Sequence, residues 1–189
     1  NAGIIGNSRF RRKVSCSGEE LNTDFVSFTM LPYTSTNAEN LNYVRVNNIL
    51  IPNVYTWPQA DNLTTGDKIQ TTTYYDGLGR PIQNVSKETI EIQPNSWADA
   101  TSFTEYDAAG RAPKSYLAYP STSTIGKFKV NAKAEQSIYI QSAYGESVNS
   151  PTYSNTTFEN SPYSRPLNVK ESGDGWGGNS SYLGNSFQY

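Results

Sequence analysis

A short pattern that occurs twice constrains the fold of this chain more than any other feature. Residues 74–80 read YYDGLGR and residues 106–111 read YDAAGR. In each copy tyrosine and aspartate end one segment. Two residues follow, then a glycine, and then an arginine that begins the next segment. Glycine adopts a positive φ at little steric cost, which a tight turn requires. The pattern therefore predicts two chain reversals between β-strands.

The segments around the first copy alternate as strands do. Residues 68–76, KIQTTTYYD, place successive side chains on opposite sides of a pleat, and residues 81–92, PIQNVSKETIEI, are expected to return as the second strand of a hairpin. Around the second copy, TSFTEYD leads in and RAPKSYLAYP leads out. Pro113 interrupts the returning arm, which predicts a sheet edge or a bulge there.

A third and weaker copy occupies residues 152–171. Phe158 and Glu159 replace tyrosine and aspartate, the turn is longer, and Arg165 is followed by proline as in the first copy. Repetition of a hairpin unit is thus the main organising feature of the chain.

Each residue of the pattern has a structural explanation. An aspartate at the entrance of a turn accepts hydrogen bonds from backbone N–H groups two or three residues further on. The arginine can meet that acid across the turn or pair with the next hairpin, and the tyrosine offers a flat apolar ring to a neighbouring repeat. The signature residues are Tyr75, Asp76, Gly79, Arg80, Tyr106, Asp107, Gly110 and Arg111, with Phe158, Glu159 and Arg165 in the third copy.

The remainder of the chain is less regular. One strand is expected near residues 24–30, a bent strand or hairpin at 41–54, a loop at 57–67, and a helix of two or three turns within 130–146 that Gly145 ends. Aromatic residues make up 13% of the chain, with 14 Tyr against 7 Phe, which suits half-buried strands. We predict an all-β fold with one short helix near 130–144. The predicted divisions are an irregular extension (1–41), a hairpin domain (42–176) and a Gly/Ser-rich tail leading into a longer chain (177–189).

Composition narrows the function. The chain contains no histidine, which removes the commonest general base and the histidine zinc sites, and Cys16 is its only cysteine. A net charge of -2 with interspersed signs argues against a nucleic-acid surface. Three of the signature acids could be read as glycosidase carboxylates, but each comes with an arginine that favours the ionised form. We therefore expect no enzyme activity, no cofactor and no metal site.

Two other features admit a binding role. Trp57, Trp97 and Trp176, with exposed tyrosines, could form a stacking platform for sugars, or they could fill gaps in a tyrosine-rich sheet. The segment GDGWGG lacks the Lys and Ser/Thr of a phosphate loop and the acids of a calcium loop, so it is interpreted as a linker.

The repeated segments also carry a family resemblance. YYDGLGRPIQNVSKE and EYDAAGRAPKSYLAYP resemble the YD repeats of the Rhs family. The succession of YDGLGRPIQ, YDAAGR, LAYPS, EQSIY, FENSPYSRPL and GDGW is similar to the domain of unknown function that precedes the repeats in Rhs proteins of Bacteroidota. This similarity covers residues 42–176.

The resemblance implies a structural role. Such a chain would contribute hairpins to the wall of a hollow β-cocoon that encloses a C-terminal toxin, and its main partner would be the rest of its own polypeptide. It also implies a secreted or cell-surface location, reached by type IX secretion with possible contact to the export machinery, and no insertion into a membrane. The alternative is an adhesin-like β-module that binds a surface glycan or protein through exposed tyrosines and tryptophans.

Overall fold

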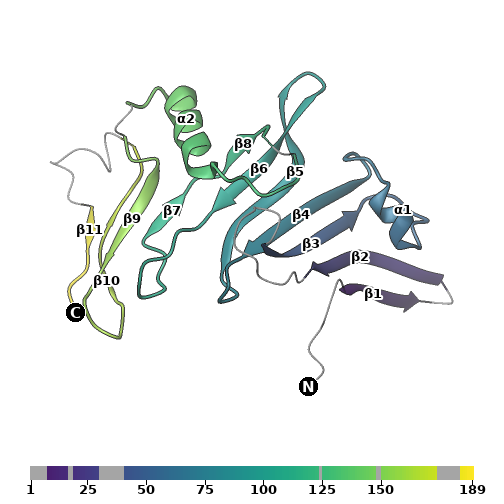
Figure 1. The fold of residues 1–189 in the computed structure, drawn as a ribbon, viewed down its shortest axis with the longest axis horizontal. Coiled ribbons are helices and arrows are strands. Elements are labelled where there is room, and N and C mark those ends of the chain that lie inside the picture. Colours follow the sequence, from purple (N-terminus) through teal and green to yellow (C-terminus); the bar gives the residue numbers. More distant parts are fainter. Residues whose placement is uncertain (1–7, 17–18, 30–40, 124, 148–149, 174–183) are drawn as a thin grey trace. The chain divides into compact units, whose positions relative to one another are not determined.

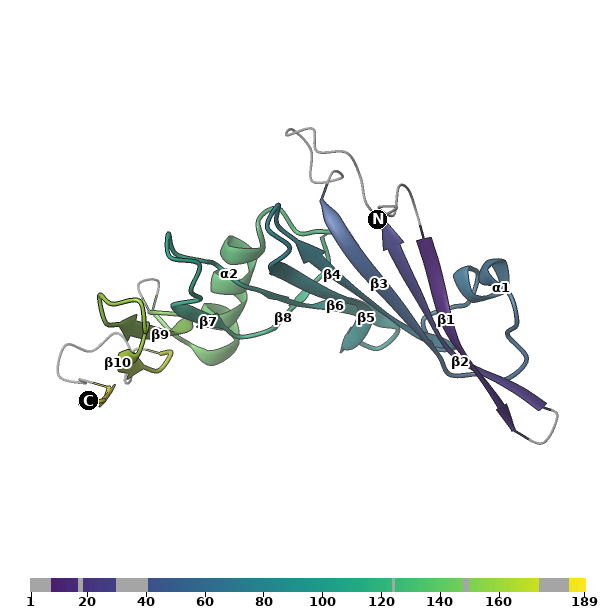
Figure 2. The same cartoon turned by 90° about the horizontal axis from the view of Figure 1, so that it is seen from below.

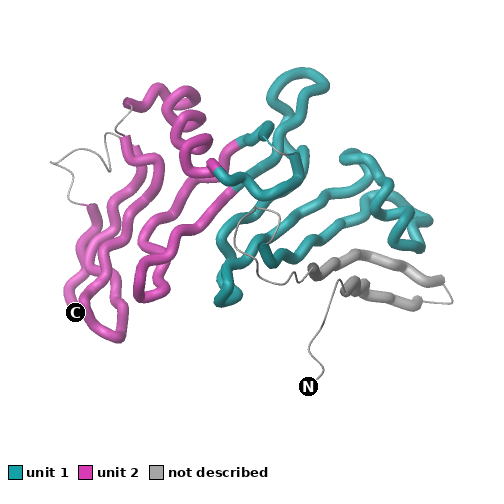
Figure 3. The backbone as a smooth tube through the Cα atoms, viewed as in Figure 1, with its two compact units in different colours: residues 1–101, 120–130 teal, residues 102–119, 131–189 magenta. Residues whose placement is uncertain are grey.

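The computed structural model describes residues 8–16, 19–29, 41–123, 125–147, 150–173 and 184–189. The chain forms two compact units, Asn1–Thr101 with Pro120–Val130, and Ser102–Tyr119 with Asn131–Tyr189 (Figure 3). The chain therefore enters the second unit, returns to the first for residues 120–130, and leaves again. The sequence pattern predicted a single hairpin domain over residues 42–176 and gave no sign of this interleaved connectivity.

A seven-stranded sheet organises the first unit. Neighbouring strands from β1 to β5 pair antiparallel. The sheet is twisted, as sheets of L-residues are (Figure 2). In sheet order the strands are β1 (Ser8–Cys16), β2 (Glu19–Thr29), β3 (Asn42–Ile49), β4 (Lys68–Tyr75), β5 (Pro81–Gln93), β6 (Ser96–Phe103) and β8 (Tyr119–Ser121) (Figure 1).

The first hairpin is confirmed. Strands β4 and β5 pair from Thr71 with Ser86 to Tyr75 with Pro81. Along β4 the predicted alternation is visible as burial, because Thr72 and Tyr74 are buried while their neighbours are partly exposed. A period of two is thus sufficient to assign the faces of this strand.

The amino-terminal part differs from expectation. The sequence pattern predicted one strand near residues 24–30, and the structure has two, β1 and β2, which pair with each other. Strand β2 also pairs with β3, so these residues extend the sheet of the first unit. Strand β3 is a single strand that ends before Pro52, not a hairpin.

The segment expected to be a loop after Pro52 contains a helix, α1 (Trp57–Asp61). Thr56 accepts a hydrogen bond from the Gln59 N–H while the Gln59 side chain accepts one from the Thr56 N–H, which is a capping box. Proline in the first turn adds a fixed helical φ. These local signals outweigh the turn-forming composition, and the loop prediction for residues 57–61 is wrong.

The second unit contains a four-stranded sheet and a helix. In sheet order the strands are β11 (Asn185–Ser186), β10 (Pro166–Lys170), β9 (Tyr153–Phe158) and β7 (Lys114–Tyr116). Helix α2 (Ala132–Tyr144) buries Ala132, Gln136 and Ile140, spaced four residues apart, and ends at Gly145 with φ 68°. The predicted helix and its terminator are confirmed, and so is the all-β fold class.

The second and third copies of the repeat behave differently. Strands β9 and β10 form the antiparallel hairpin of the third copy. The strands around the second copy, β6 and β7, belong to different sheets, so this copy keeps the turn but is not a hairpin. Strand β7 lies at the edge of its sheet, as Pro113 predicted.

The carboxyl-terminal residues add a short strand to the tail, of which residues 174–183 lie outside the described part. Asn185 and Ser186 pair with Val169 and Asn168. A Cβ at Gly184 would lie 2.4 Å from the Val169 carbonyl oxygen, so only glycine permits this approach. Among the described helices, none is long and apolar enough to cross a membrane.

Candidate functional site

The first turn is closed by an acid and an arginine four residues apart. The Asp76 N–H donates to the Arg80 carbonyl oxygen at 2.9 Å. Asp76 Oδ1 accepts from the backbone N–H groups of Leu78 and Arg80, each at 2.9 Å, and Oδ2 accepts from Arg80 Nε at 2.7 Å and pairs with Nη2 at 2.7 Å. Gly79 has φ 77°. One carboxylate thus holds both the backbone and the arginine of the turn.

The second turn repeats this geometry. The Asp107 N–H donates to the Arg111 carbonyl oxygen at 2.8 Å, and Asp107 Oδ1 accepts from the N–H groups of Ala109 and Arg111, each at 2.9 Å. Arg111 Nε and Nη2 both lie 2.8 Å from Oδ2, and Gly110 has φ 79°. The repeat is therefore a repeat of turn chemistry, which survives where the flanking strands diverge.

The third turn achieves the same closure with a longer acid. The Glu159 N–H donates to the Arg165 carbonyl oxygen at 2.9 Å, and Arg165 Nε donates to both carboxylate oxygens at 3.0 and 3.1 Å. Ser161 Oγ donates to Glu159 Oε1 at 2.6 Å. Ser164, with φ 51°, takes the left-handed conformation that glycine has in the other turns. We refer to the three as the acid–arginine turns.

Hydrogen bonding holds the three acids in the ionised form. The backbone N–H of the turn arginine is the largest cause that lowers the pKa of Asp76 and of Asp107. The Arg165 side chain, followed by Ser161, lowers the pKa of Glu159 to about 2. A carboxyl group in this state accepts hydrogen bonds but does not act as a general acid near neutral pH.

The second and third turns are also linked within the second unit. The Arg111 guanidinium lies over the Phe158 ring at 4.9 Å, and its Nη1 donates to the Glu159 carbonyl oxygen at 3.3 Å. Arg111 thus contacts both Asp107 in its own turn and the start of the third turn. Tyr75 and Tyr106, the signature tyrosines, are half-buried.

The three tryptophans fall in different surroundings. Trp57 is half-buried and packs, as Ile49 does, against the buried side chains of Val54 and Ala60. Trp97 on β6 is 47% exposed. Trp176 lies outside the described residues. Of the two described tryptophans, Trp57 therefore packs in a small core and Trp97 is exposed.

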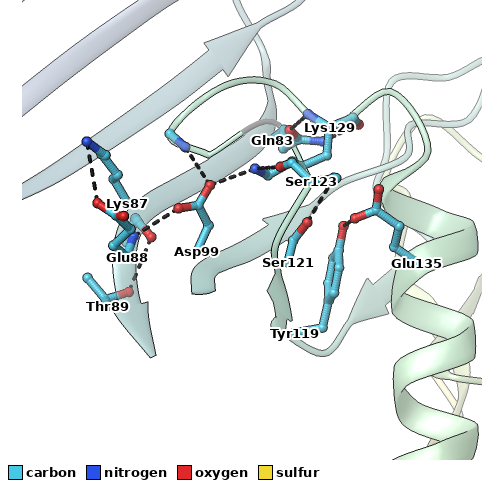
Figure 4. Close-up of polar contacts among 12 residues, drawn as sticks. Gln83, Lys87, Glu88, Thr89, Asp99, Tyr119, Ser121, Ser123, Lys129 and Glu135 are labelled. Atoms are coloured by element: carbon cyan, nitrogen blue, oxygen red, sulfur yellow. Dashed lines mark hydrogen bonds and ion pairs between the residues drawn. The ribbon is translucent and has the colours of Figure 1, made fainter. Parts of the chain in front are cut away.

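The first unit contains a buried ion pair that no sequence pattern predicted (Figure 4). Lys129 Nζ lies 2.6 Å from Asp99 Oδ2, and both side chains are completely buried. Asp99 also accepts from the backbone N–H of Glu88 at 2.9 Å and of Gly126 at 2.6 Å, and Lys129 Nζ donates to the Ser123 carbonyl oxygen. Each charge therefore has an opposite charge and further hydrogen bonds, the condition under which burial is tolerated.

Gln83 completes this buried cluster. Its side-chain amide accepts from the Lys129 N–H at 2.6 Å and donates to the Lys129 carbonyl oxygen at 3.0 Å. Thr101 Oγ1 is the one fully buried side-chain oxygen or nitrogen among the described residues without a hydrogen-bond partner. Near Lys129, Gly126 has a positive φ of 69°, which suits glycine. Lysine is normally exposed, so the residue type at position 129 did not predict its burial.

An aromatic and acidic cluster lies in the second unit. Tyr116 stacks on Phe103 with ring centroids 4.2 Å apart and donates to Glu105 Oε2 at 2.5 Å. Glu105 also accepts from Lys133 at 2.8 Å. Burial, followed by the hydrogen bond to Glu105, raises the pKa of Tyr116, so the phenol stays protonated. This cluster joins β7 to α2 through fully paired charges.

Among the residues that the structure describes, no group of three or more His, Cys, Asp and Glu could hold a metal ion. The fold and the site together define an all-β chain in which three reversals are closed by acid–arginine turns. Residues 50–189 match the family described as "Domain of unknown function (DUF6443)", and the chain belongs to this family. Neither a curated protein nor a solved structure matches the chain.

Proposed function

We propose that the chain is a non-catalytic structural segment of a large, secreted or surface-displayed Rhs-like protein. In this proposal its hairpins form part of a shell that encloses a C-terminal toxin. The observation that carries the proposal is the threefold recurrence of the acid–arginine turn. In each turn the N–H of the acid donates to the carbonyl oxygen of the arginine, and Nε of the arginine donates to the carboxylate.

The chemistry of these turns supports a structural role over a catalytic one. Each acid is bound to an arginine and to backbone N–H groups, so its hydrogen-bonding capacity is used to fix the turn. Catalytic carboxyl groups are instead placed where burial or a like charge raises the pKa. The buried Lys129 is likewise paired with Asp99 at 2.6 Å, so the contacts of its ammonium group are taken up within the fold.

The sheet edges support assembly with further strands. Strand β1 ends the seven-stranded sheet, and the short strands β7 and β11 end the four-stranded sheet. Edge strands present backbone groups that another strand can pair. The partner in this proposal is the remainder of the same long polypeptide, with secretion by the type IX route of Bacteroidota as its expected context.

The size of the natural product tests the proposal. Antibodies against this segment would be used to isolate it from the envelope and the culture medium of the source cells, and its intact mass would be measured. A species far above 20.9 kDa that contains these peptides is expected. A stable secreted species near 20.9 kDa would refute the role as a shell segment.

An adhesin-like binding role is the second candidate, and one observation favours it. Arg165 lies 5.7 Å from the Tyr163 ring centroid and 4.6 Å from that of Tyr189, and these rings are 82% and 66% exposed. Exposed rings beside a guanidinium suit stacking and hydrogen bonding to a sugar. A glycan array would test this, with Tyr163→Ala as the matched variant. Binding that Tyr163→Ala abolishes would support the role, and no response across sugar classes would remove it.

A further inference from the structure

Residues 125–130, here called the strap, cross the sheet of the first unit after β8 has ended. Gly126 and Lys129 contact Asp99 on β6, Lys129 contacts Gln83 on β5, and Phe128 contacts Tyr74 on β4. The strap therefore spans three neighbouring strands, as the close-up of Asp99, Gln83 and Lys129 shows in part (Figure 4).

The strap is held by side chains of the sheet. Asp99 binds the Gly126 N–H, and Gln83 binds both the N–H and the carbonyl oxygen of Lys129. Strand β8 stops at Ser121, and the strap itself is assigned as turn and coil, so it does not continue the strand ladder. Opening the strap can therefore leave the backbone ladder of β4 and β5 intact.

No apolar side chain of the strap is fully buried, and Ile125 is half-buried. Phe128 is half-buried and meets Tyr74 edge-on with ring centroids 5.2 Å apart. Lys127 is exposed, and Val130 is 72% exposed. Since apolar burial is the main favourable term in folding, the strap is bound less firmly than the strands beneath it.

The ion pair does not change this balance. The attraction between two buried charges is largely offset by the loss of their hydration, and opening returns both groups to water. The ion pair instead determines which residues of the strap dock on the sheet. The other bonds from Asp99 and Gln83 go to backbone groups, which any residue offers, whereas the ion pair requires the lysine side chain. Gly126 adds to this selection, since a Cβ there would lie 3.1 Å from Lys87 Cδ.

We propose that the strap opens and recloses as one unit while the β4–β5 part of the sheet stays folded. Opening uncovers Tyr74, Gln83 and Asp99, which contact the strap and are buried in the closed form. The strap would be a built-in movable cover of this face, and this inference does not depend on the role proposed for the longer protein.

Native-state hydrogen exchange of the full chain, followed by NMR, tests the proposal. The reporters are the amides of Gly126 and Lys129, and the references are the amides of β4 and β5 between residues 71 and 86. The reporters are expected to have protection factors at least about tenfold lower than the references, with little dependence on urea below the unfolding transition. Equal protection and equal urea dependence would overturn the proposal.

Variants at two lysines sharpen the test. Lys129→Met leaves Asp99 buried without its counter-charge and is expected to lower the reporter protection by about a further tenfold, with the reference amides unchanged. Lys127→Met, on the exposed lysine two positions earlier, should change neither set. If Lys129→Met lowers both sets equally, the strap is part of the cooperative core. If that variant does not fold, the measurement on the unmodified chain decides.

Discussion

Replacing Gln136 with methionine is expected to destabilise the second unit. Gln136 on α2 is completely buried, and its Nε2 donates to the Thr152 carbonyl oxygen at 2.8 Å. Its Oε1 accepts from the Thr152 hydroxyl at 2.8 Å. Methionine has a similar length but cannot make either bond, so two buried polar groups of Thr152 lose their partner.

The magnitude follows from these two groups. A buried polar group left without a partner costs about 1–3 kcal/mol, and burying a more apolar side chain returns about 1 kcal/mol. For the two groups of Thr152 together, Gln136→Met is therefore expected to lower the free energy of unfolding by about 1–5 kcal/mol. Thr152→Val, which leaves only the Gln136 oxygen unpaired, is expected to cost about 1–3 kcal/mol. The double variant should cost less than the sum, because the two side chains contact each other.

Urea unfolding followed by circular dichroism would measure these values. Gln141→Met is the matched control, because Gln141 lies on the same helix, is half-buried, and donates a longer bond of 3.1 Å to Ser137. Its change should stay within about 0.5 kcal/mol. A Gln136→Met value as small as that of the control would refute the assignment of the buried amide as an anchor of α2.

Three further predictions concern the turns and the strap. Gly126→Ala introduces a Cβ at φ 69° and is expected to cost about 1–3 kcal/mol in urea unfolding, while a cost near zero would contradict the closed position of the strap. The pKa of Glu159, about 2 in the folded chain, lies below its ordinary value of 4.5. The contribution of Glu159 to stability is therefore present above pH 4.5 and is lost as the pH falls toward 2. In Arg165→Gln an NMR titration should show the pKa of Glu159 rising toward 4.5. Asp76→Asn should speed amide exchange at Leu78 and Arg80 and leave the third turn unchanged, whereas loss of a catalytic activity with no change in exchange would favour an enzyme.

Much of the site could be predicted because its interactions are local. Asp76 and Arg80 are four residues apart, and the conformation that Gly79 permits brings them together whatever surrounds the turn. The same holds for the second turn, where the pattern predicted the bonds correctly but not the partners of the flanking strands. A turn is specified by its own residues, while the choice of a neighbouring strand depends on the whole sheet.

The sequence by itself determined the β-rich fold class, the three reversals and the helix that Gly145 ends, because alternation, turn chemistry and capping act over a few residues. Only the tertiary structure decided that the chain returns to the first unit at residues 120–130. It also decided that Lys129 is buried, since its partners Asp99 and Gln83 are 30 and 46 positions away. The ammonium group of a lysine is expected in water unless other groups replace that water. Here a carboxylate from a distant strand and the Ser123 carbonyl oxygen do so, and no local pattern in the sequence records that replacement.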